Sequence, residues 1–475
     1  MRFVRLLCSV SVLLGIAAPL SAAPVRDIQD ADAVGEKLYR NSGAEGMVLV
    51  VVRKNQVFFQ GYGETAPRSH RVPDADTVLR LCSLTKIFTS DILSKLAADR
   101  TVSLNDPLQR YAPNQMLVPS HGQPITLQDL ATHTSGLPRE VGYPQDGTAF
   151  TFPDFTTRWQ WLPRQHPQFT PGTAAHYSNI GYDLLSDALS GATHKSYPNL
   201  LHERTLKPLR MYSTTFYPNA EQCARLMVPT REVSPCTVTD ATQGSSGLYS
   251  TANDMAHWLK YLLGTSGSGF PAQQPSAQSI YLRPEQLRSQ QGMNAGGTPS
   301  GLGLGWVHLN EPESQSELIQ KTGGGAGYLT YIVLHPASHT ALFMALTVGP
   351  RTSHSGSIFM EANDAILEMA GLPPMPTPGA SARLRNARGV PRGAVAPRGK
   401  TAPSIAPAGR NTPRTARGKA AATPKTSTRP EKPAAKTARP ARRATATSAK
   451  SSRAEKQPAK AARKTTPKAA KHVRH

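Results

Sequence analysis

The sequence predicts an α/β protein of the α+β type, with one antiparallel sheet flanked by helices and an additional all-α lobe. Two observations lead to this fold class. Runs typical of strands occur near both ends of the body of the chain, at 46–62 and at 318–348. Between them, helical patterns of apolar residues predominate over roughly 90–300. We therefore expect a sheet assembled from both ends of the body, with the α-rich lobe inserted between its two parts.

The first expected elements are a helix at 30–39 and a β-hairpin. GMVLVVVR at 46–53 and QVFFQGY at 56–62 are rich in β-branched and aromatic residues, and only Lys54 and Asn55 separate them. Two such runs joined by so short a turn are typical of a hairpin.

A short buried strand at 77–81 then leads into a buried helix. Apolar residues recur every four positions with no Gly or Pro between them, at Leu84, Phe88, Ile92 and Leu96. Ser83 would therefore open a helix directly after a strand. At the other end of the body we expect strands at 318–322, 328–334 and 340–348, followed by a helix at 358–370.

Both ends of the chain differ from the body. Arg2 and Arg5 precede an apolar run at 6–18 and then small residues, the pattern of a secretory signal peptide at 1–22. The apolar run is shorter than the about 20 residues that span a bilayer. We expect the body at 23–375 to be one catalytic domain, exported to the periplasm, with peripheral membrane association as an additional option.

The basic character of the chain comes from a tail at 376–475. Residues 381–475 contain 26 Lys and Arg but only 2 Asp and Glu, so the rest, with 28 basic and 29 acidic residues, is nearly neutral. The tail has no aromatic residue and cannot bury enough apolar surface to order itself. We expect it to be disordered and either to bind anionic envelope polymers or lipid headgroups, or to be a solvated appendage; no nucleic-acid partner is expected for an exported protein.

Three cysteines remain after the signal peptide. Cys223 and Cys236 are separated by twelve residues in a polar, Pro-containing stretch, and export permits a disulfide between them. Closing so short a loop stabilises a fold by about 3 kcal/mol on the chain-entropy model. Cys82 is left as a buried free thiol. No spacing of His and Cys indicates a metal site.

Three short motifs could carry chemistry. Ser83 and Lys86 lie three positions apart and would share a helix face, but these residues alone favour a Ser N-cap with a solvated Lys. In Tyr177-Ser178-Asn179, an extended backbone would point the first and third side chains to the same side. Lys321-Thr322 lead into three glycines, which suit either an ordinary hairpin or close approach of another backbone.

Together, in this order, Ser-x-x-Lys, Tyr-x-Asn and Lys-Thr-Gly resemble the motif set of the serine β-lactamase/penicillin-binding protein family, in its class C β-lactamase-like branch. The resemblance covers roughly 30–372. Several stretches are most similar to AmpH-type D-alanyl-D-alanine carboxypeptidase/endopeptidases, namely YGETAPRS at 62–69, ITLQDLATHTSGLPRE at 125–140, QCARLMVP at 222–229 with SPC at 234–236, and QKTGGGAGYLTY at 320–331. The resemblance implies the β-lactamase/transpeptidase-like fold.

The resemblance also implies the roles of the site residues. Ser83 would be the nucleophile of acyl transfer, and the backbone N–H groups of Ser83 and Gly324 would form the oxyanion hole. Asn179, Lys321, Thr322 and Gly323 would bind substrate. His133 lies in a loop beside the site in this family and is expected to be structural.

The base that activates Ser83 is left open between Lys86 and Tyr177. A free lysine has a pKa near 10.4, so Lys86 needs burial and a neighbouring positive charge, such as Lys321, to become an amine near neutral pH. Tyr177 could take the proton instead.

The implied function is a serine D-alanyl-D-alanine carboxypeptidase/DD-endopeptidase that acts on peptidoglycan peptide stems and binds β-lactams as inhibitors or substrates. No cofactor is implied. The alternatives are a class C-type β-lactamase, an esterase of the same fold, which retention of Lys321 disfavours, and a non-catalytic envelope-binding protein, which the complete motif set disfavours.

Overall fold

The computed structural model describes residues 30–141, 152–264, 276–310 and 314–375, all of which belong to one unit, Met1–Arg392. The expected signal peptide at 1–22 and the expected tail at 376–475 lie outside the described residues.

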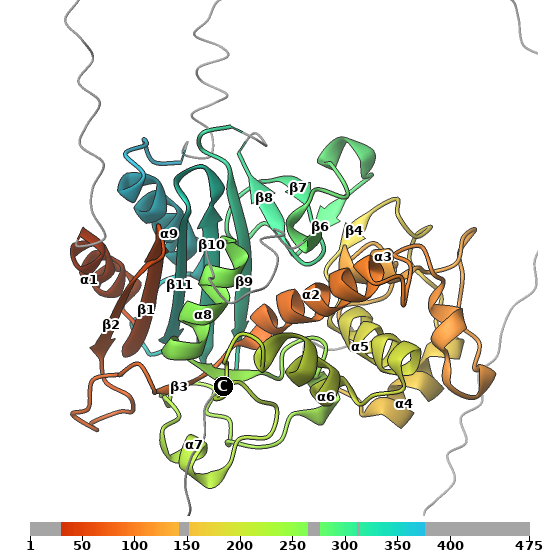
Figure 1. The fold of residues 1–475 in the computed structure, drawn as a ribbon, viewed down its shortest axis with the longest axis horizontal. Coiled ribbons are helices and arrows are strands. Elements are labelled where there is room, and N and C mark those ends of the chain that lie inside the picture. The colour runs from red at the N-terminus through yellow and green to blue at the C-terminus, as the bar shows by residue number, and fades with distance from the viewer. Residues whose placement is uncertain (1–29, 142–151, 265–275, 311–313, 376–475) are drawn as a thin grey trace, which may run out of the picture. The chain divides into compact units, whose positions relative to one another are not determined.

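A seven-stranded antiparallel sheet forms the centre of this unit, in the order β2-β1-β11-β10-β9-β8-β7. Its N-terminal part is the expected hairpin, and its C-terminal part is a meander that ends beside β1, so strands from both ends of the body form one sheet (Figure 1). The strands are β1 Gly46–Arg53, β2 Gln56–Gly63, β7 Pro299–Leu302, β8 Val307–Leu309, β9 Leu318–Gly325, β10 Tyr328–His335 and β11 Thr340–Thr347.

The central strands are buried on both faces, which explains their nearly continuous apolar sequences. Along β1, Val48, Val50 and Val52 belong to one hydrophobic cluster, whereas Leu49 and Val51 belong to a second cluster on the opposite face. This follows from the two-residue period of a strand. At the hairpin, Lys54 and Asn55 both have positive φ angles, as a two-residue turn that matches the twist of the strands requires.

Helices cover the two faces of the sheet. α1 (Ala31–Ser42) and α9 (Ser355–Met369) contribute to the cluster on one face, and α8 (Ala252–Leu262) packs on the other face. Figure 1 shows α8 crossing in front of the central strands, with α1 and α9 at the far side. The expected α+β fold class is confirmed.

The helices of the remaining lobe lie between β2 and β8 in the sequence. The hydrophobic residues of these helices, except α7, join the same cluster as the α8 face of the sheet, so the lobe and the sheet share one core. The helices are α2 Thr85–Ala98, α3 Leu127–Ala131, α4 Phe155–Trp161, α5 Asn179–Thr193, α6 Tyr197–Leu201 and α7 Ala220–Ala224.

Two small sheets connect the lobe to the large sheet. β3 (Val78–Arg80) pairs antiparallel with β5 (Tyr249–Thr251), and β4 (Ala175–His176) pairs parallel with β6 (Gln290–Gln291). β3 lies within the strand expected at 77–81. The other strands of these sheets, and the short strands β7 and β8, were not expected from the sequence.

No helix in the described part of the chain is both long enough and apolar enough to span a bilayer.

Candidate active site

The segment that carries Ser83 is a strand, a tight turn and a helix. β3 is followed by a 3₁₀ turn at Cys82–Leu84, and α2 begins at Thr85, two residues later than the sequence pattern indicated. Cys82 has a φ angle of 50°, a left-handed conformation that is uncommon for a residue other than Gly. The turn leaves Ser83 partly exposed while its neighbours on both sides are buried. The hydroxyl is thereby presented at the end of a rigid support.

Lys86 is completely buried, and its side chain reaches the Ser83 hydroxyl from the first turn of α2. Its Nζ lies 3.3 Å from Oγ of Ser83 and donates hydrogen bonds to Oδ1 of Asn179 at 2.5 Å and to the carbonyl oxygen of Ser245 at 2.8 Å. Burial lowers the pKa of Lys86 to about 7, against the opposing effect of nearby carboxyl groups. An amine that loses its proton near neutral pH can act as a general base.

Two positive charges assist burial, Arg139 and Lys321. Beside burial, Arg139 lowers the pKa of Lys86, and Asp183 and Glu140 raise it. Lys321, which the sequence predicts for this role, contributes because the repulsion between its ammonium and that of Lys86 is mutual. Arg139 has no signal in the sequence, because nothing in the spacing of PRE at 138–140 marks it as part of the site.

Tyr177 supplies the second group on Ser83. Its phenol donates a hydrogen bond to Oγ of Ser83 at 2.7 Å. Three cations surround its ring: Nζ of Lys86 and Nζ of Lys321 each lie 4.9 Å from the ring centroid, and Cζ of Arg139 lies 4.8 Å from it. Cations over an aromatic face are attracted by the quadrupole of the ring. The tyrosine therefore lies at the centre of a strongly positive site.

His133 supports Tyr177 and is not placed to act as a base. The two rings stack with centroids 4.4 Å apart, and Nδ1 of His133 accepts a hydrogen bond from the backbone N–H of Ser178. Burial and the surrounding cations hold the pKa of His133 well below its usual value, so its ring is neutral. Nδ1 is an acceptor here, which assigns the ring proton to Nε2.

Asn179 is the first residue of α5, and Ser178 caps that helix by accepting from the N–H of Gly181 at 3.0 Å. The extended conformation considered for Tyr177–Asn179 therefore ends at Ser178. The Asn179 side chain bridges two buried groups, since its oxygen accepts from Lys86 and its Nδ2 donates to Glu140. One N–H and one lone pair of this amide remain for a substrate.

Lys321 and the glycines lie on β9 beside Ser83. Burial lowers the pKa of Lys321 to about 8, with contributions from Lys86 and Arg139, while Tyr177 opposes the shift. Thr322 is partly exposed and Gly324 is exposed. Gly323 packs so tightly that an added Cβ would lie 3.2 Å from the backbone nitrogen of Ser83.

The register of β9 directs the Gly324 N–H away from β10. Ala326 and Gly327 form a two-residue turn, and both have positive φ angles. Gly325 and Tyr328 are therefore the hydrogen-bonded pair that closes the hairpin. Gly324 and Thr322 then occupy non-hydrogen-bonded positions relative to β10, so their backbone N–H and C=O groups point to the opposite edge of β9. β8 pairs with β9 only at 318–320, so within the described residues this edge is unpaired beyond Gln320.

Cys223 and Cys236 form a disulfide, and the segment that they enclose contacts the end of β3, which leads to Ser83. Arg80, at the end of β3, donates to the carbonyl oxygens of Ser234 and Pro235. Cys82 is a buried free thiol, and burial raises its pKa to about 12, so it stays protonated. Its Sγ donates to the carbonyl oxygen of Gly325.

The structure thus brings together the side chains of Ser83, Lys86, Tyr177, Asn179 and Lys321, with Thr322, Gly323 and Gly324 on the adjacent edge. It adds neighbours that sequence reasoning missed, Arg139, Glu140, Asp183 and Ser245, whose only common feature is an interaction with Lys86. In the described part of the chain, no group of three or more His, Cys, Asp and Glu side chains could hold a metal ion.

Comparisons with known proteins identify the family of the chain. A family model described as Beta-lactamase matches residues 29–361. D-alanyl-D-alanine-carboxypeptidase/endopeptidase AmpH of Escherichia coli (strain K12) is 39% identical over 378 residues, which cover 79% of this chain and 98% of that protein.

Solved structures share the fold. A β-lactamase/D-alanine carboxypeptidase from Yersinia pestis, complexed with citrate, is 42% identical, with a TM-score of 0.67 over 72% of this chain and 97% of that chain. A class C β-lactamase from Rhodobacter sphaeroides has the same fold at 20% identity, with a TM-score of 0.58 over 72% of this chain and 99% of that chain. The resemblance expected from the motifs is confirmed, and the chain belongs to the Beta-lactamase family.

Proposed function

We propose that this protein is a serine D-alanyl-D-alanine carboxypeptidase/DD-endopeptidase that acts on peptidoglycan peptide stems through an acyl-enzyme on Ser83. The observation that carries the proposal is the convergence of Lys86 Nζ, at 3.3 Å, and the Tyr177 hydroxyl, at 2.7 Å, on the Ser83 hydroxyl. A nucleophile in contact with a base, which is itself held by further groups, is the arrangement of covalent acyl transfer. The 39% identity to the Escherichia coli carboxypeptidase/endopeptidase supports the substrate class.

The reaction begins when Oγ of Ser83 attacks the carbonyl carbon that joins two D-alanines, or that of a cross-link amide. The serine proton passes to the lone pair of the unprotonated Lys86 amine or to Tyr177 acting as a phenolate. The carbonyl π electrons move onto oxygen, where the N–H groups of Ser83 and Gly324 stabilise the negative charge. Collapse of this intermediate expels the amine, which takes up the proton, and water then hydrolyses the ester.

Substrate binding is assigned to the positive edge of the site. Lys321 and Thr322 bind the terminal carboxylate, and Asn179 binds the amide on the acyl side with its remaining hydrogen-bonding capacity. Gly323 and Gly324 let the substrate backbone approach the unpaired edge of β9, where it can add as a further strand.

The test is to follow D-alanine release from purified muropeptides alongside nitrocefin hydrolysis, for the wild type and for Ser83→Ala. D-alanine release with slow nitrocefin turnover and a long-lived penicilloyl adduct supports the proposal. Penicillin labelling that persists in folded Ser83→Ala would show that the nucleophile is another residue.

The second candidate is a class C-type β-lactamase. The relative from Yersinia pestis is described both as a β-lactamase and as a D-alanine carboxypeptidase, at 42% identity. The same geometry would acylate Ser83 with a β-lactam, so only the rate of deacylation separates the two functions. Fast loss of the adduct in intact-mass spectrometry, without D-alanine release, favours this candidate.

The ends of the chain suggest where the enzyme works. We propose export to the periplasm by the signal peptide at 1–22, a catalytic domain at 23–375, and binding of the basic tail at 376–475 to anionic envelope polymers or membrane surface. Deletion of 381–475 should remove salt-sensitive binding to anionic vesicles and leave D-alanine release intact. Equal binding by both proteins would remove the role of the tail.

A further inference from the structure

Asp183 is a buried carboxyl group one helical turn behind Asn179 on α5. Residues four apart lie on one face of a helix, so Asp183 lies on the same face as the amide that contacts Lys86. The hydroxyl of Ser245 donates to Oδ2 of Asp183 at 3.1 Å, and the carbonyl oxygen of Ser245 accepts from Nζ of Lys86 at 2.8 Å. Ser245 therefore links Asp183 to Lys86 through two successive hydrogen bonds.

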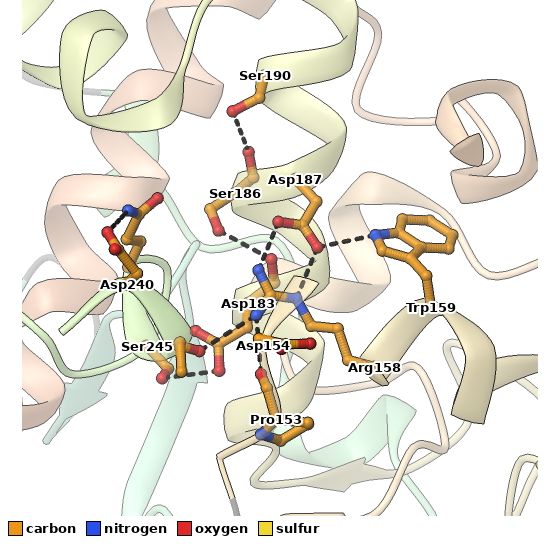
Figure 2. A network of polar contacts seen from close by, with 12 residues as sticks. Pro153, Asp154, Arg158, Trp159, Asp183, Ser186, Asp187, Ser190, Asp240 and Ser245 are labelled. Carbon is orange, nitrogen blue, oxygen red and sulfur yellow. Dashed lines mark hydrogen bonds and ion pairs between the residues drawn. The ribbon is translucent and has the colours of Figure 1, made fainter. Parts of the chain in front are cut away.

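This carboxyl group is incompletely satisfied. Asp183 is 2% exposed, and its Oδ1 is buried with no hydrogen-bond partner among the described residues. A buried carboxylate is costly unless opposite charge compensates it. The network around it supplies one such charge, Arg158, but the hydrogen bonds of its guanidinium go to Asp187 and to backbone carbonyls (Figure 2).

Asp187 and Arg158 form a two-point ion pair. It accepts from Nε and from one terminal nitrogen of the guanidinium at 2.7 and 2.6 Å, and it also accepts from the indole N–H of Trp159 at 2.8 Å. Arg158 and Lys86 both act electrostatically on Asp183, and of the two only Lys86 is also linked to it through Ser245. Asp183 and Lys86 act on each other electrostatically, in addition to their link through Ser245.

We propose that Asp183 is a positioning residue for acyl transfer, which holds Lys86 against Ser83 through Ser245 and stabilises the ammonium that forms when Lys86 takes the serine proton. The inference rests on the proposed function, in which Ser83 is the nucleophile. The proton leaves the Ser83 hydroxyl for the lone pair of Lys86 Nζ as the Ser83 oxygen bonds the carbonyl carbon. It returns to the leaving nitrogen when the tetrahedral intermediate collapses.

The arrangement follows the logic of a catalytic triad, in which a third, acidic group orients the base and stabilises its protonated form. Other charged and titratable groups also face the pair. Those around Lys86 are Glu140, Arg139, Cys82, Lys321, Tyr177, Tyr182 and His133, and those around Asp183 are Arg158, Asp187 and Tyr197. Among them, Asp183 and Glu140 are the carboxyl groups that raise the pKa of Lys86, and burial raises the pKa of Asp183 itself.

The experiment measures the pH dependence of single-turnover acylation by a fluorescent penicillin in the full chain, between pH 5 and pH 9. A carboxylate keeps Lys86 protonated to higher pH, so Asp183→Asn should move the midpoint of the acidic limb down by about one unit or more. The plateau rate should fall about tenfold, because the amine becomes a weaker base. Ser245→Ala keeps the Asp183 carboxyl group but removes the hydroxyl that donates a hydrogen bond to it. This variant should also lower the midpoint of the acidic limb, by less than Asp183→Asn does.

The matched control is Asp254→Asn, which changes a buried carboxyl group on α8 that accepts from Ser213 and Thr214 and has no contact with Lys86. Its midpoint should equal that of the wild type. An unshifted midpoint in Asp183→Asn, or an equal shift in the control, overturns the proposal. If Asp183→Asn does not fold, Ser245→Ala decides by the same criterion. Absence of acylation in the wild type would instead remove the proposed function itself.

Discussion

The phenol of Tyr177 donates a hydrogen bond to the hydroxyl oxygen of Ser83 at 2.7 Å, although 94 positions separate the two residues in the sequence. The same hydroxyl lies 3.3 Å from the amine of Lys86. Ser83 therefore has two neighbours that can carry its proton, one from the end of β4 and one from α2.

Replacement of Tyr177 by Phe tests the first neighbour. Loss of the phenol should lower the rate of acylation by penicillin about 100-fold, the usual contribution of a group that transfers a proton. Stopped-flow fluorescence with a labelled penicillin measures it. Tyr62→Phe is the control, because the Tyr62 hydroxyl contacts Asp32 on the other side of the molecule. An unchanged rate in Tyr177→Phe would leave Lys86 as the sole proton acceptor.

The buried lysines predict how stability depends on pH. Their ordinary pKa is 10.5, and the fold lowers it to about 7 for Lys86 and about 8 for Lys321. Between about pH 7 and pH 8.5 the unfolded chain therefore binds more protons than the folded one, so the free energy of unfolding rises with pH. Each full proton of difference contributes about 1.4 kcal/mol per pH unit.

Urea unfolding of the wild type and of Lys321→Met across this range measures the effect. The range lies below pH 9.0, the ordinary pKa of Cys82, so the thiol of the unfolded chain remains mostly protonated. The variant should show a smaller rise with pH. Lys37→Met, at an exposed position of α1, should keep the slope of the wild type. Equal slopes in all three proteins would contradict a deprotonated Lys321 in the fold.

Gly323 predicts a steric effect on the oxyanion site. A Cβ at this position would lie 2.1 Å from Oγ1 of Thr330 and close to the backbone of Leu81 and Ser83, so β9 or the Ser83 turn must shift. Gly323→Ala should therefore lower kcat for D-alanine release about 100-fold, the scale of losing one oxyanion donor. Gly191→Ala, on α5 with 3.6 Å to its nearest neighbour, is the control and should keep full activity. Similar activities in both variants would show that β9 tolerates displacement.

The disulfide predicts a stability effect that is separate from chemistry. Cys223 and Cys236 are 13 positions apart, and the bridge should contribute about 3 kcal/mol by restricting the unfolded chain. Cys223→Ser should unfold at lower urea concentration than the wild type, and reductant should shift the wild type to the same midpoint. Labelling of Ser83 should persist below that midpoint. Identical midpoints with and without reductant would show that the bridge does not stabilise the fold.

Local sequence patterns were sufficient for the large elements. The hairpin at Lys54-Asn55 and the strands β9, β10 and β11 are specified by runs of eight residues joined by turns of two or four residues, and their pairing partners are close in sequence. The short strands are different. β4 and β6 have two residues each and pair across more than 100 positions, so no local pattern marks them.

The three motifs could be recognised from the sequence alone, in their order along the chain, because Ser-x-x-Lys, Tyr-x-Asn and Lys-Thr-Gly are local patterns. How their side chains behave depends on the folded arrangement. Complete burial turns Lys86 into a base near pH 7, and the partners that balance it, Arg139, Glu140 and Asp183, come from segments with no motif of their own. Proton affinity depends on distance and burial in three dimensions, and neither quantity is encoded in spacing along the chain.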